Sequence, residues 1–455
     1  MFDGVATLTN PSVTKGFQVK IIFRRWLDQC KHRIMSRLDK TKDTMTFEPQ
    51  FSAGNIHYDV SDRVGAITCG GIGAMHMLAQ RLGLPDAIDQ RLHLLKIHLP
   101  YHESDQVLNF AYNALRDGTC LQDIELRRHN EHYLNALGTR RIPDPTTAGD
   151  FCRRFTLSHL HTFIDIVNDT RLKVWAEQPN EFFDCAKIDL DGTIVETTGE
   201  CKGGMDISYK GTWGYHPLIV SLANTGETLS LINRSGNRPS HEGAAAEADR
   251  AMRLCFQGGF RQVVLRGDTA FSQTQYLDDW QNDPRIRFFF GYKAAPNLEQ
   301  IAENLPASAW QRLERPARYQ VKTKARRRPA NVKEQVVKDR EFENLRLESE
   351  DVAEFLYQPV ACRETYRMVV VRKNISVEKG EQVLFPDERY FFYITNDYDC
   401  TPAEVVFEAN DRCDQENHIA QLHNGVRALH APVDNLESNW AYMLMTALAW
   451  NLKAW

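Results

Sequence analysis

The sequence predicts an α/β protein whose mixed-sheet core carries a β-rich insertion and follows an all-α N-terminal domain. Residues 72–178 show helical periodicity without any β pattern. From about residue 183, strand-like runs are followed by alternating helix and strand, and residues 295–400 return to strands. The 455 residues suffice for several domains. The expected units are a basic arm (1–45), a helical domain (46–180) and an α/β domain (181–455) with its insertion at about 295–400.

Composition limits the class of protein. With 42% hydrophobic and 25% charged residues and a net charge of −5, the chain resembles an ordinary globular protein, which excludes disordered and fibrous classes. The ten cysteines form no CxxC pair, so we expect reduced thiols in a cytoplasmic protein. No signal peptide is expected at the N-terminus. The apolar run 440–450 is shorter than the roughly 20 residues of a membrane span and predicts a buried helix.

The first 45 residues are basic, with nine Lys or Arg against four acidic residues. The stretch 21–40 places Ile22, Trp26 and Ile34 at helical spacing with basic residues between them. Two interpretations stay open, a solvated amphipathic helix and an arm that contacts DNA.

The following region predicts several helices. The segment 105–118 places Val107, Leu108 and Ala111 on one face, and a second long helix is expected over 157–178. Paired arginines suit DNA binding, although a helical bundle with a charged surface explains them equally well. These pairs are Arg127–Arg128, Arg140–Arg141 and Arg153–Arg154.

The insertion contains a strongly basic stretch. Arg312 to Arg340 holds eleven Lys or Arg against three acidic residues, and an acidic stretch follows at 341–354. This local excess exceeds ordinary surface usage, so we expect contact with a polyanion, centred on Arg326, Arg327 and Arg328.

Two aspartates stand at the ends of expected strands. Asp191 ends the strand-like AKIDLD, and Asp189 lies on the same face of that strand. Asp191-Gly192 is also a strong hairpin-turn signal. Asp268 ends VVLRGD, at the kind of strand end where ligand sites gather in α/β sheets, but it would also serve as a helix N-cap.

A glutamate on an expected helix completes the set. Glu416 lies in NDRCDQENHIAQLHNG, where Cys413, Ile419 and Leu422 share one face and Arg412 lies four residues before Glu416. A surface ion pair between Arg412 and Glu416 is the simpler interpretation. Two strand-end aspartates and a helical glutamate can instead hold two Mg²⁺ ions about 4 Å apart, which supports phosphodiester chemistry without Cys or His ligands.

Assembled in order, these motifs resemble bacterial insertion-sequence transposases of the DDE class, in the branch with a β-rich insertion between the second Asp and the Glu. The segments that carry the resemblance are DLDGTIVETTG, YKGTWGYHPLIVSLANTGE, LRGDTAF, RCDQENHIAQLHNG and NWAYMLMTALAWNLKAW. They cover about residues 180–455, and SDQVLNFAYNALRDG through PDPTTAGDFCRRF is similar to the helical front half of such proteins. The resemblance implies an RNase H-like core.

The resemblance also implies roles for single residues. Asp191 matches the first catalytic Asp because Thr193 completes an Asp-x-Thr motif, with Asp189 as the alternative, and Asp268 and Glu416 match the other two. All three would be catalytic and bind two Mg²⁺ ions, with Mn²⁺ as a substitute. Arg412 fits the Arg of the family's flanking motif and His423 stands where that motif has Lys, so both are expected to contact DNA. The Tyr of that motif is replaced by Ala409.

The implied function is transposition. The protein would bind the inverted-repeat ends of its own element as a homodimer on double-stranded DNA, cleave them with metal-activated water, and join the 3′-OH ends to target DNA. It would act in the cytoplasm, at the bacterial nucleoid, and not at a membrane. A stand-alone RNase H-like nuclease would share the three carboxylates but needs no end-specific helical domain. A transposase-derived DNA-binding protein without activity is the third alternative.

Overall fold

The computed structural model describes residues 24–33, 35, 68–96, 98, 100–315, 329–379 and 382–455. The chain divides into two units, the compact Cys69–Trp455 and the N-terminal Met1–Thr68. In the latter, residues 24–33 are helical and most of their side chains are exposed, as an amphipathic basic segment predicts. Whether this helix contacts DNA stays a prediction.

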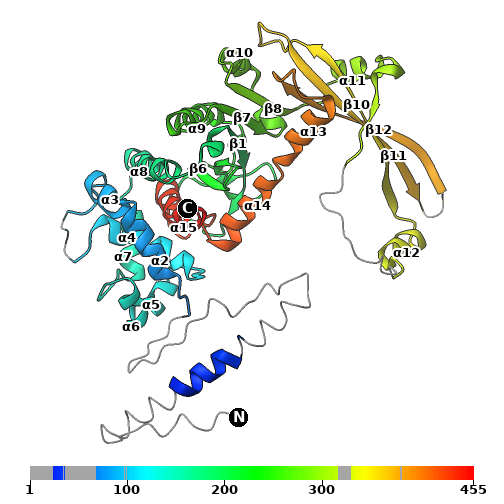
Figure 1. The fold of residues 1–455 in the computed structure, drawn as a ribbon. Coiled ribbons are helices and arrows are strands. Elements are labelled where there is room, and N and C mark those ends of the chain that lie inside the picture. The colour runs from blue at the N-terminus through cyan, green and yellow to red at the C-terminus, as the bar shows by residue number, and fades with distance from the viewer. Residues whose placement is uncertain are drawn as a thin grey trace, which may run out of the picture. The chain divides into compact units, whose positions relative to one another are not determined.

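The helical region of the larger unit is built around one buried helix (Figure 1). Its helices are α2 (Ile72–Arg81), α3 (Leu84–Arg91), α4 (Glu103–Leu115), α5 (Asp123–Arg128), α6 (Glu131–Ala136), α7 (Pro145–Cys152) and α8 (Leu157–Trp175). All residues from Glu103 to Ala114 are buried except the exposed Asp105, which closes a capping box with His102 at the start of α4. The expected long helices are therefore present at α4 and α8.

The C-terminal helix joins the helical region to the sheet. Helix α15 (Leu436–Ala454) packs against α4, α7, α8 and the strand β6 (Glu227–Ile232). The Trp440 indole donates a hydrogen bond to the carbonyl of Leu231 on β6 at 2.7 Å. Every residue of α15 from Ser438 to Ala449 is buried, which confirms that the apolar run 440–450 lies in the core. In the described part of the chain, no helix has the length and apolar character that crossing a membrane requires.

A nine-stranded sheet forms the centre of the α/β part, in the order β6-β5-β1-β7-β8-β12-β11-β10-β9. β5 runs antiparallel to β1, whereas β7 and β8 continue in parallel. The first five strands have the RNase H-like order, so this part of the predicted fold is confirmed. The bounds are β1 (Cys185–Gly192), β5 (Leu218–Leu222), β7 (Gln262–Gly267), β8 (Ile286–Tyr292), β9 (Gln311–Arg312), β10 (Glu343–Tyr357), β11 (Tyr366–Lys379) and β12 (Gln382–Thr395). A small second sheet contains β2 (Val195–Glu196), β4 (Trp213–Tyr215) and β3 (Asp206–Ile207).

Helices cover the two faces of this sheet. Phe288 and Phe290 of β8 pack in the cluster that contains α9 (Ala244–Gly258), whereas Phe289 packs with α13 (Pro402–Asp411). Because alternate side chains of a strand point to opposite faces, α9 and α13 lie on opposite sides of β8. Short helices η1 (Asn180–Phe183), η2 (Thr269–Phe271), η3 (Thr274–Tyr276), η4 (Ala307–Ala309), α10 (Leu277–Gln281) and α11 (Pro296–Glu303) complete the core.

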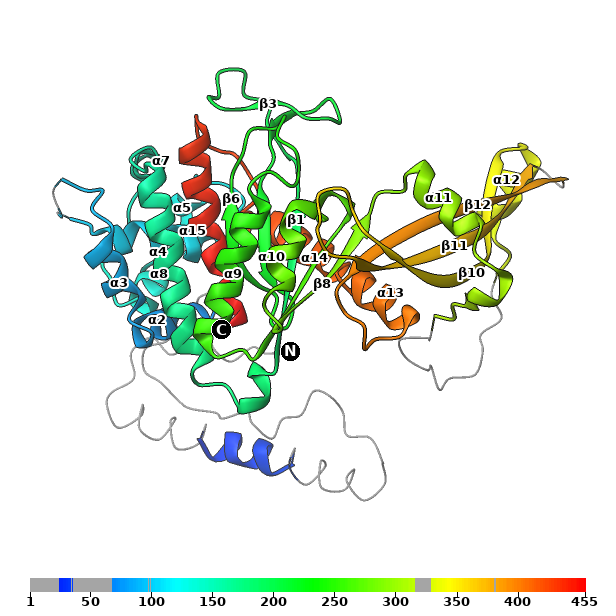
Figure 2. The same ribbon diagram turned by 90° about the horizontal axis from the view of Figure 1, so that it is seen from above.

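The expected β-rich insertion is present, and it extends the core sheet. β12 pairs antiparallel with β8, and β11 and β10 continue outward as long strands (Figure 2). Helix α12 (Val332–Asp339) precedes β10. The predicted DNA-binding cluster Arg326, Arg327 and Arg328 lies outside the described residues. At the start of the basic stretch, Arg315 forms an ion pair with Glu350 on β10 at 2.6 Å.

Candidate active site

The two strand-end aspartates lie on neighbouring parallel strands. Leu190 of β1 pairs with Gly267 of β7, so Asp191 and Asp268 follow directly at adjacent positions. Parallel neighbours are spaced about 4.8 Å apart, which brings the two carboxylates to the same edge of the sheet. Asp191 is still within β1, because that strand continues through Gly192 and the Asp-Gly pair does not form a hairpin turn.

The structure shows the helix-capping role that the sequence offered for Asp268, and its role as a metal ligand stays a prediction. Its Oδ1 accepts a hydrogen bond from the backbone N–H of Ala270 at 2.8 Å and so caps η2. The chain turns sharply here: a Cβ at Gly267 would come within 2.7 Å of the Phe271 Cβ. Within the described part of the chain, Oδ2 of Asp268 has no hydrogen-bond partner, so capping leaves one oxygen open at the strand end.

Glu416 reaches the site on α14 (Asp414–Ala420), which follows α13 after a turn at Arg412 and Cys413. The apolar face expected from Cys413, Ile419 and Leu422 is only partly correct, because Cys413 is exposed. Two buried polar side chains anchor α14 to the sheet instead. Gln415 Oε1 accepts a hydrogen bond from Ser221 Oγ on β5, and His418 Nε2 lies 3.0 Å from Thr228 Oγ1 on β6. These anchors leave the Glu416 side chain exposed.

Asp268, Glu416 and Arg412 all influence the pKa of Asp191. Burial raises the pKa of Asp191 to about 6. The backbone N–H of Gly192 and the guanidinium of Arg412 oppose the rise, whereas the carboxylates of Asp268 and Glu416 add to it. The Gly192 N–H lies 2.7 Å from Asp191 Oδ1. The fold thus brings all three predicted carboxylates and Arg412 into one electrostatic neighbourhood.

Asp189, the alternative first Asp, is used differently. Both of its carboxylate oxygens bind the guanidinium of Arg266 on β7, at 2.6 and 2.9 Å. The same guanidinium donates to Glu408 Oε1 on α13 at 2.9 Å, and Lys187 Nζ lies 2.7 Å from Glu408 Oε2. Asp189 is therefore enclosed in an ion-pair network, whereas Asp191 keeps its Oδ2 without a hydrogen bond from any described residue. This geometry favours Asp191.

The residues expected to contact DNA differ in their placement. Arg412 caps the end of α13 and lies near enough to Asp191 to act on it electrostatically, and among the described residues it forms no ion pair with Glu416. His423 lies further along, in the π-helical turn η5 (Gln421–Gly425), where its Nδ1 is 3.0 Å from Asn424 Oδ1. Its ring centroid lies 4.7 Å from that of His430. Arg412 is thus the one of these two whose charge acts on Asp191.

The carboxylates of Asp191, Asp268 and Glu416 are of the chemical type that binds a divalent cation, although they do not form a closed coordination site. In the described ranges, no three His, Cys, Asp or Glu side chains are grouped closely enough to hold a metal ion. The open oxygens of Asp191, Asp268 and Glu416 are the hard ligands that Mg²⁺ prefers, and Mg²⁺ retains waters, so one or two carboxylates can suffice. The raised pKa of Asp191 reflects negative charge in a partly buried place, which a cation would offset.

The ion-pair network around Arg266 was not identified from the sequence. Its signal was present, because an arginine within the apolar strand VVLRG must find a partner when that strand is buried. Asp189 on the neighbouring strand was the obvious candidate. The third member, Glu408, lies 142 residues away in the sequence and could not be paired without the fold.

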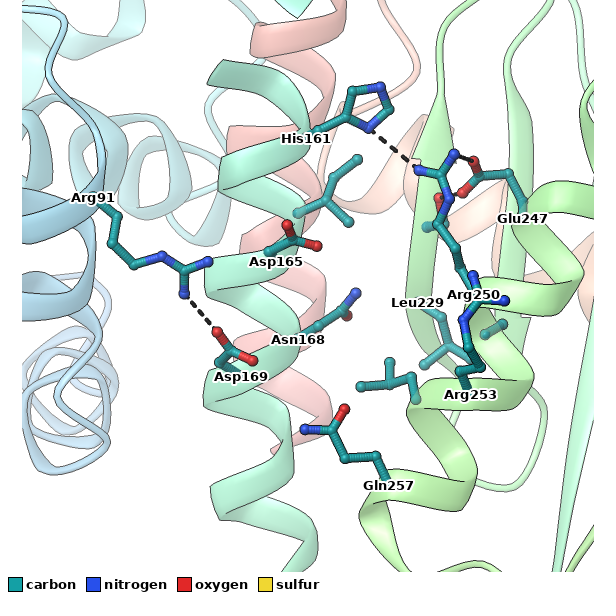
Figure 3. Close-up of a pocket in the computed structure, with 14 residues that line it drawn as sticks. Arg91, His161, Asp165, Asn168, Asp169, Leu229, Glu247, Arg250, Arg253 and Gln257 are labelled. Atoms are coloured by element: carbon teal, nitrogen blue, oxygen red, sulfur yellow. Dashed lines mark hydrogen bonds and ion pairs between the residues drawn. The ribbon is translucent and has the colours of Figure 1, made fainter. Parts of the chain in front are cut away.

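A cavity separate from the strand-end site lies between α8 and α9 (Figure 3). It has a volume of about 580 Å³. Two of its three acidic side chains are engaged in ion pairs, since Asp169 pairs with Arg91 at 2.5 Å and Glu247 with Arg250 at 3.2 Å. None of the sequence-predicted site residues lines it. It offers no group of open carboxylates comparable to the strand-end site.

Comparison with known proteins gives three findings. Residues 65–455 match the family described as transposase DDE domain group 1. No curated protein matches the chain. Among solved structures, a piggyBac transposase synaptic complex with hairpin DNA is similar, with 9% sequence identity and a TM-score of 0.39. That similarity covers 83% of this chain and 73% of the other. Because the family match spans most of the sequence, the chain belongs to the DDE transposases, in the family described as transposase DDE domain group 1.

Proposed function

We propose that the protein is a DNA transposase that binds the inverted-repeat ends of its own element, cleaves them and joins the 3′-OH ends to target DNA. The observation that carries this proposal is that the charges of Asp268 and Glu416 act on Asp191. These three residues come from two adjacent strand ends and one helix. Family membership supports the same reaction class.

In this proposal Asp191, Asp268 and Glu416 hold two Mg²⁺ ions, for which Mn²⁺ can substitute. When bound, the ions activate a water or a 3′-OH and stabilise the leaving oxygen of the phosphodiester. The chain's own part is to hold three carboxylates at one edge of the sheet. η2 fixes Asp268 through the Ala270 N–H, and the anchored helix α14 carries Glu416.

Arg412 supplies positive charge at the same place. Its guanidinium partly offsets the rise that burial causes in the pKa of Asp191. It therefore favours the ionised carboxylate, which is the form that binds a metal ion. A cation beside the cleaved bond also suits a phosphate contact. We assign to the helical region before residue 180 the choice of end sequence, and to the insertion a grip on the DNA backbone. The active form on DNA is a homodimer.

The proposal is tested with the full chain and the DNA that flanks its gene. Labelled duplexes carrying the flanking inverted repeats are incubated with a supercoiled plasmid and Mg²⁺ or Mn²⁺. Transposase activity predicts cut ends and their covalent joining to the plasmid, absent with a shuffled repeat. Asp268→Asn should abolish both reactions while end binding persists. Cleavage of any duplex without joining would instead identify a nuclease, and binding without cleavage a DNA-binding protein.

A further inference from the structure

One buried guanidinium connects β1 and β7, whose ends carry Asp191 and Asp268, with α13, the helix that precedes the one carrying Glu416. Arg266 lies on β7, two residues before Asp268. It bonds Asp189 on β1, two residues before Asp191, and Glu408 on α13, one helical turn before Arg412. The Arg266 side chain is 3% exposed and that of Asp189 is 2% exposed. The Arg266–Asp189 pair is therefore shielded from bulk solvent.

The geometry uses the whole fork of the guanidinium. Nε and Nη2 bind the two oxygens of Asp189, at 2.6 and 2.9 Å, in a bidentate pair. Nη1 points the other way and binds Glu408 Oε1 at 2.9 Å. Such a planar, two-sided contact fixes direction as well as distance, which a lysine ammonium cannot reproduce.

Stability alone does not explain this cluster. Removing charges from water costs about as much as a buried ion pair returns, and apolar replacements are often neutral or stabilising. The β1–β7 contact is already secured by a backbone ladder from Cys185 to Leu190. By contrast, only side chains can set the distance between this ladder and α13, which leads to Glu416.

We propose that Arg266 is a positioning residue that, through Asp189 and Glu408, sets the spacing between the strand-end aspartates and the helix leading to Glu416. This inference rests on the proposed function, since it concerns ligands for the same two metal ions. Asp189 is then a partner of Arg266 and not a ligand, and Glu408 transmits the position of α13. Arg266 itself touches neither DNA nor metal.

The first test compares Arg266→Lys with Arg171→Lys, a matched control. Arg171 forms a fully buried ion pair with Glu227 at 2.7 Å, joining α8 to β6. The measured quantities are the melting temperature without metal and the Mn²⁺ concentration that gives half of the metal-induced rise in melting temperature. Loss of a group bonded directly to a metal ligand typically costs 10–100-fold in metal affinity. Because Arg266 acts through one further residue, Arg266→Lys should raise the half-saturating Mn²⁺ concentration by about tenfold, the lower end of that range. Arg171→Lys should lower only the melting temperature.

A second test does not depend on the folding of Arg266→Lys. Glu408 is partly exposed, so Glu408→Gln weakens the α13 link by removing its charge while the Arg266–Asp189 pair remains. Half-saturating Mn²⁺ is measured for Glu408→Gln, Glu416→Gln and the double variant. If Glu408 acts by placing Glu416, Glu408→Gln should raise the half-saturating Mn²⁺ concentration by a smaller factor in the Glu416→Gln background than in the wild type.

The outcomes separate the two proposals. If the wild type shows no Mn²⁺ response and cuts no DNA, the proposed function fails and this inference fails with it. If the wild type responds and Arg266→Lys responds at the same Mn²⁺ concentration, the positioning role alone is overturned. Fully multiplicative effects of Glu408→Gln and Glu416→Gln would overturn it as well.

Discussion

Asp191 is expected to destabilise the metal-free protein at neutral pH. Its folded pKa of about 6 lies above the value of about 3.9 in an unfolded chain. The folded state therefore binds more protons than the unfolded state between these two pH values. Protonation of Asp191 thus stabilises the fold fully below pH 4, and this stabilisation is lost as the pH rises through 6. Asp191→Asn removes the charge and keeps an oxygen for the Gly192 N–H.

Urea unfolding in EDTA at pH 7.5 and pH 4.5 measures this effect. We expect Asp191→Asn to raise the unfolding free energy at pH 7.5 by at most about 3 kcal/mol, with a much smaller gain at pH 4.5. DNA cleavage should be lost at the same time. A variant that is less stable at both pH values would show that Asp191 is not held at an electrostatic cost.

Gly192 is a second residue on which the site depends. A Cβ there would lie 2.9 Å from His216 Nε2 and 3.5 Å from Arg234 Nη2, both from buried side chains. Gly192→Ala should therefore destabilise the fold by about 1–3 kcal/mol and displace the end of β1. Gly70→Ala is the control, because a Cβ at Gly70 meets nothing within 4 Å. Equal unfolding free energies for the two variants in urea would contradict this expectation.

At the scale of elements, helix α14 is sensitive to acid. Burial lowers the pKa of His418 to about 4, and its ring stacks on Trp450. Because the unfolded value is near 6.5, the unfolded state binds more protons in this range. The stabilisation is full above pH 6.5 and is lost as the pH falls toward 4. This dependence is opposite in sign to that of Asp191.

Hydrogen exchange of the α14 amides, corrected for intrinsic rates, measures this effect. In the wild type, protection should fall between pH 7 and pH 5, whereas in His418→Gln it should be weaker and nearly constant over that range. The amides of β11, remote from His418, are an internal control. A wild-type profile that stays flat in α14 would mean that His418 protonation does not open this helix.

Individual elements differ in how far the sequence determines them. α8 and β7 follow from periodicity and end signals, and Asp191, Asp268 and Glu416 follow from motifs. The sequence indicates strands in the insertion, but it does not indicate that β12 pairs with β8. Likewise, the burial of Gln415 and His418 depends on Ser221 and Thr228, which approach α14 only in the folded chain. Pairing between distant segments is what local pattern cannot supply.

At the scale of the whole molecule, α15 makes the helical region and the sheet interdependent. Trp440 is 2% exposed, and truncation to alanine should cost about 3–5 kcal/mol. Trp213→Ala, at a 53% exposed position, is the control and should change stability little. Far-ultraviolet circular dichroism and tryptophan fluorescence should show one coincident unfolding transition in both variants. Separate transitions would mean that the two parts fold independently.

The continuity of the nine-stranded sheet has a mechanical consequence. β12 lies two strands from β7 in the sheet, a distance of about 10 Å. A force applied to the part of the insertion nearest β8 is therefore transmitted through backbone hydrogen bonds toward Asp268. The ladders are irregular between Leu347 and Ser349 and between Val377 and Glu378. Such bulges are where strands bend. The part of the insertion beyond these bulges can therefore bend, while the part of β12 that pairs with β8 keeps its alignment with the strand ends.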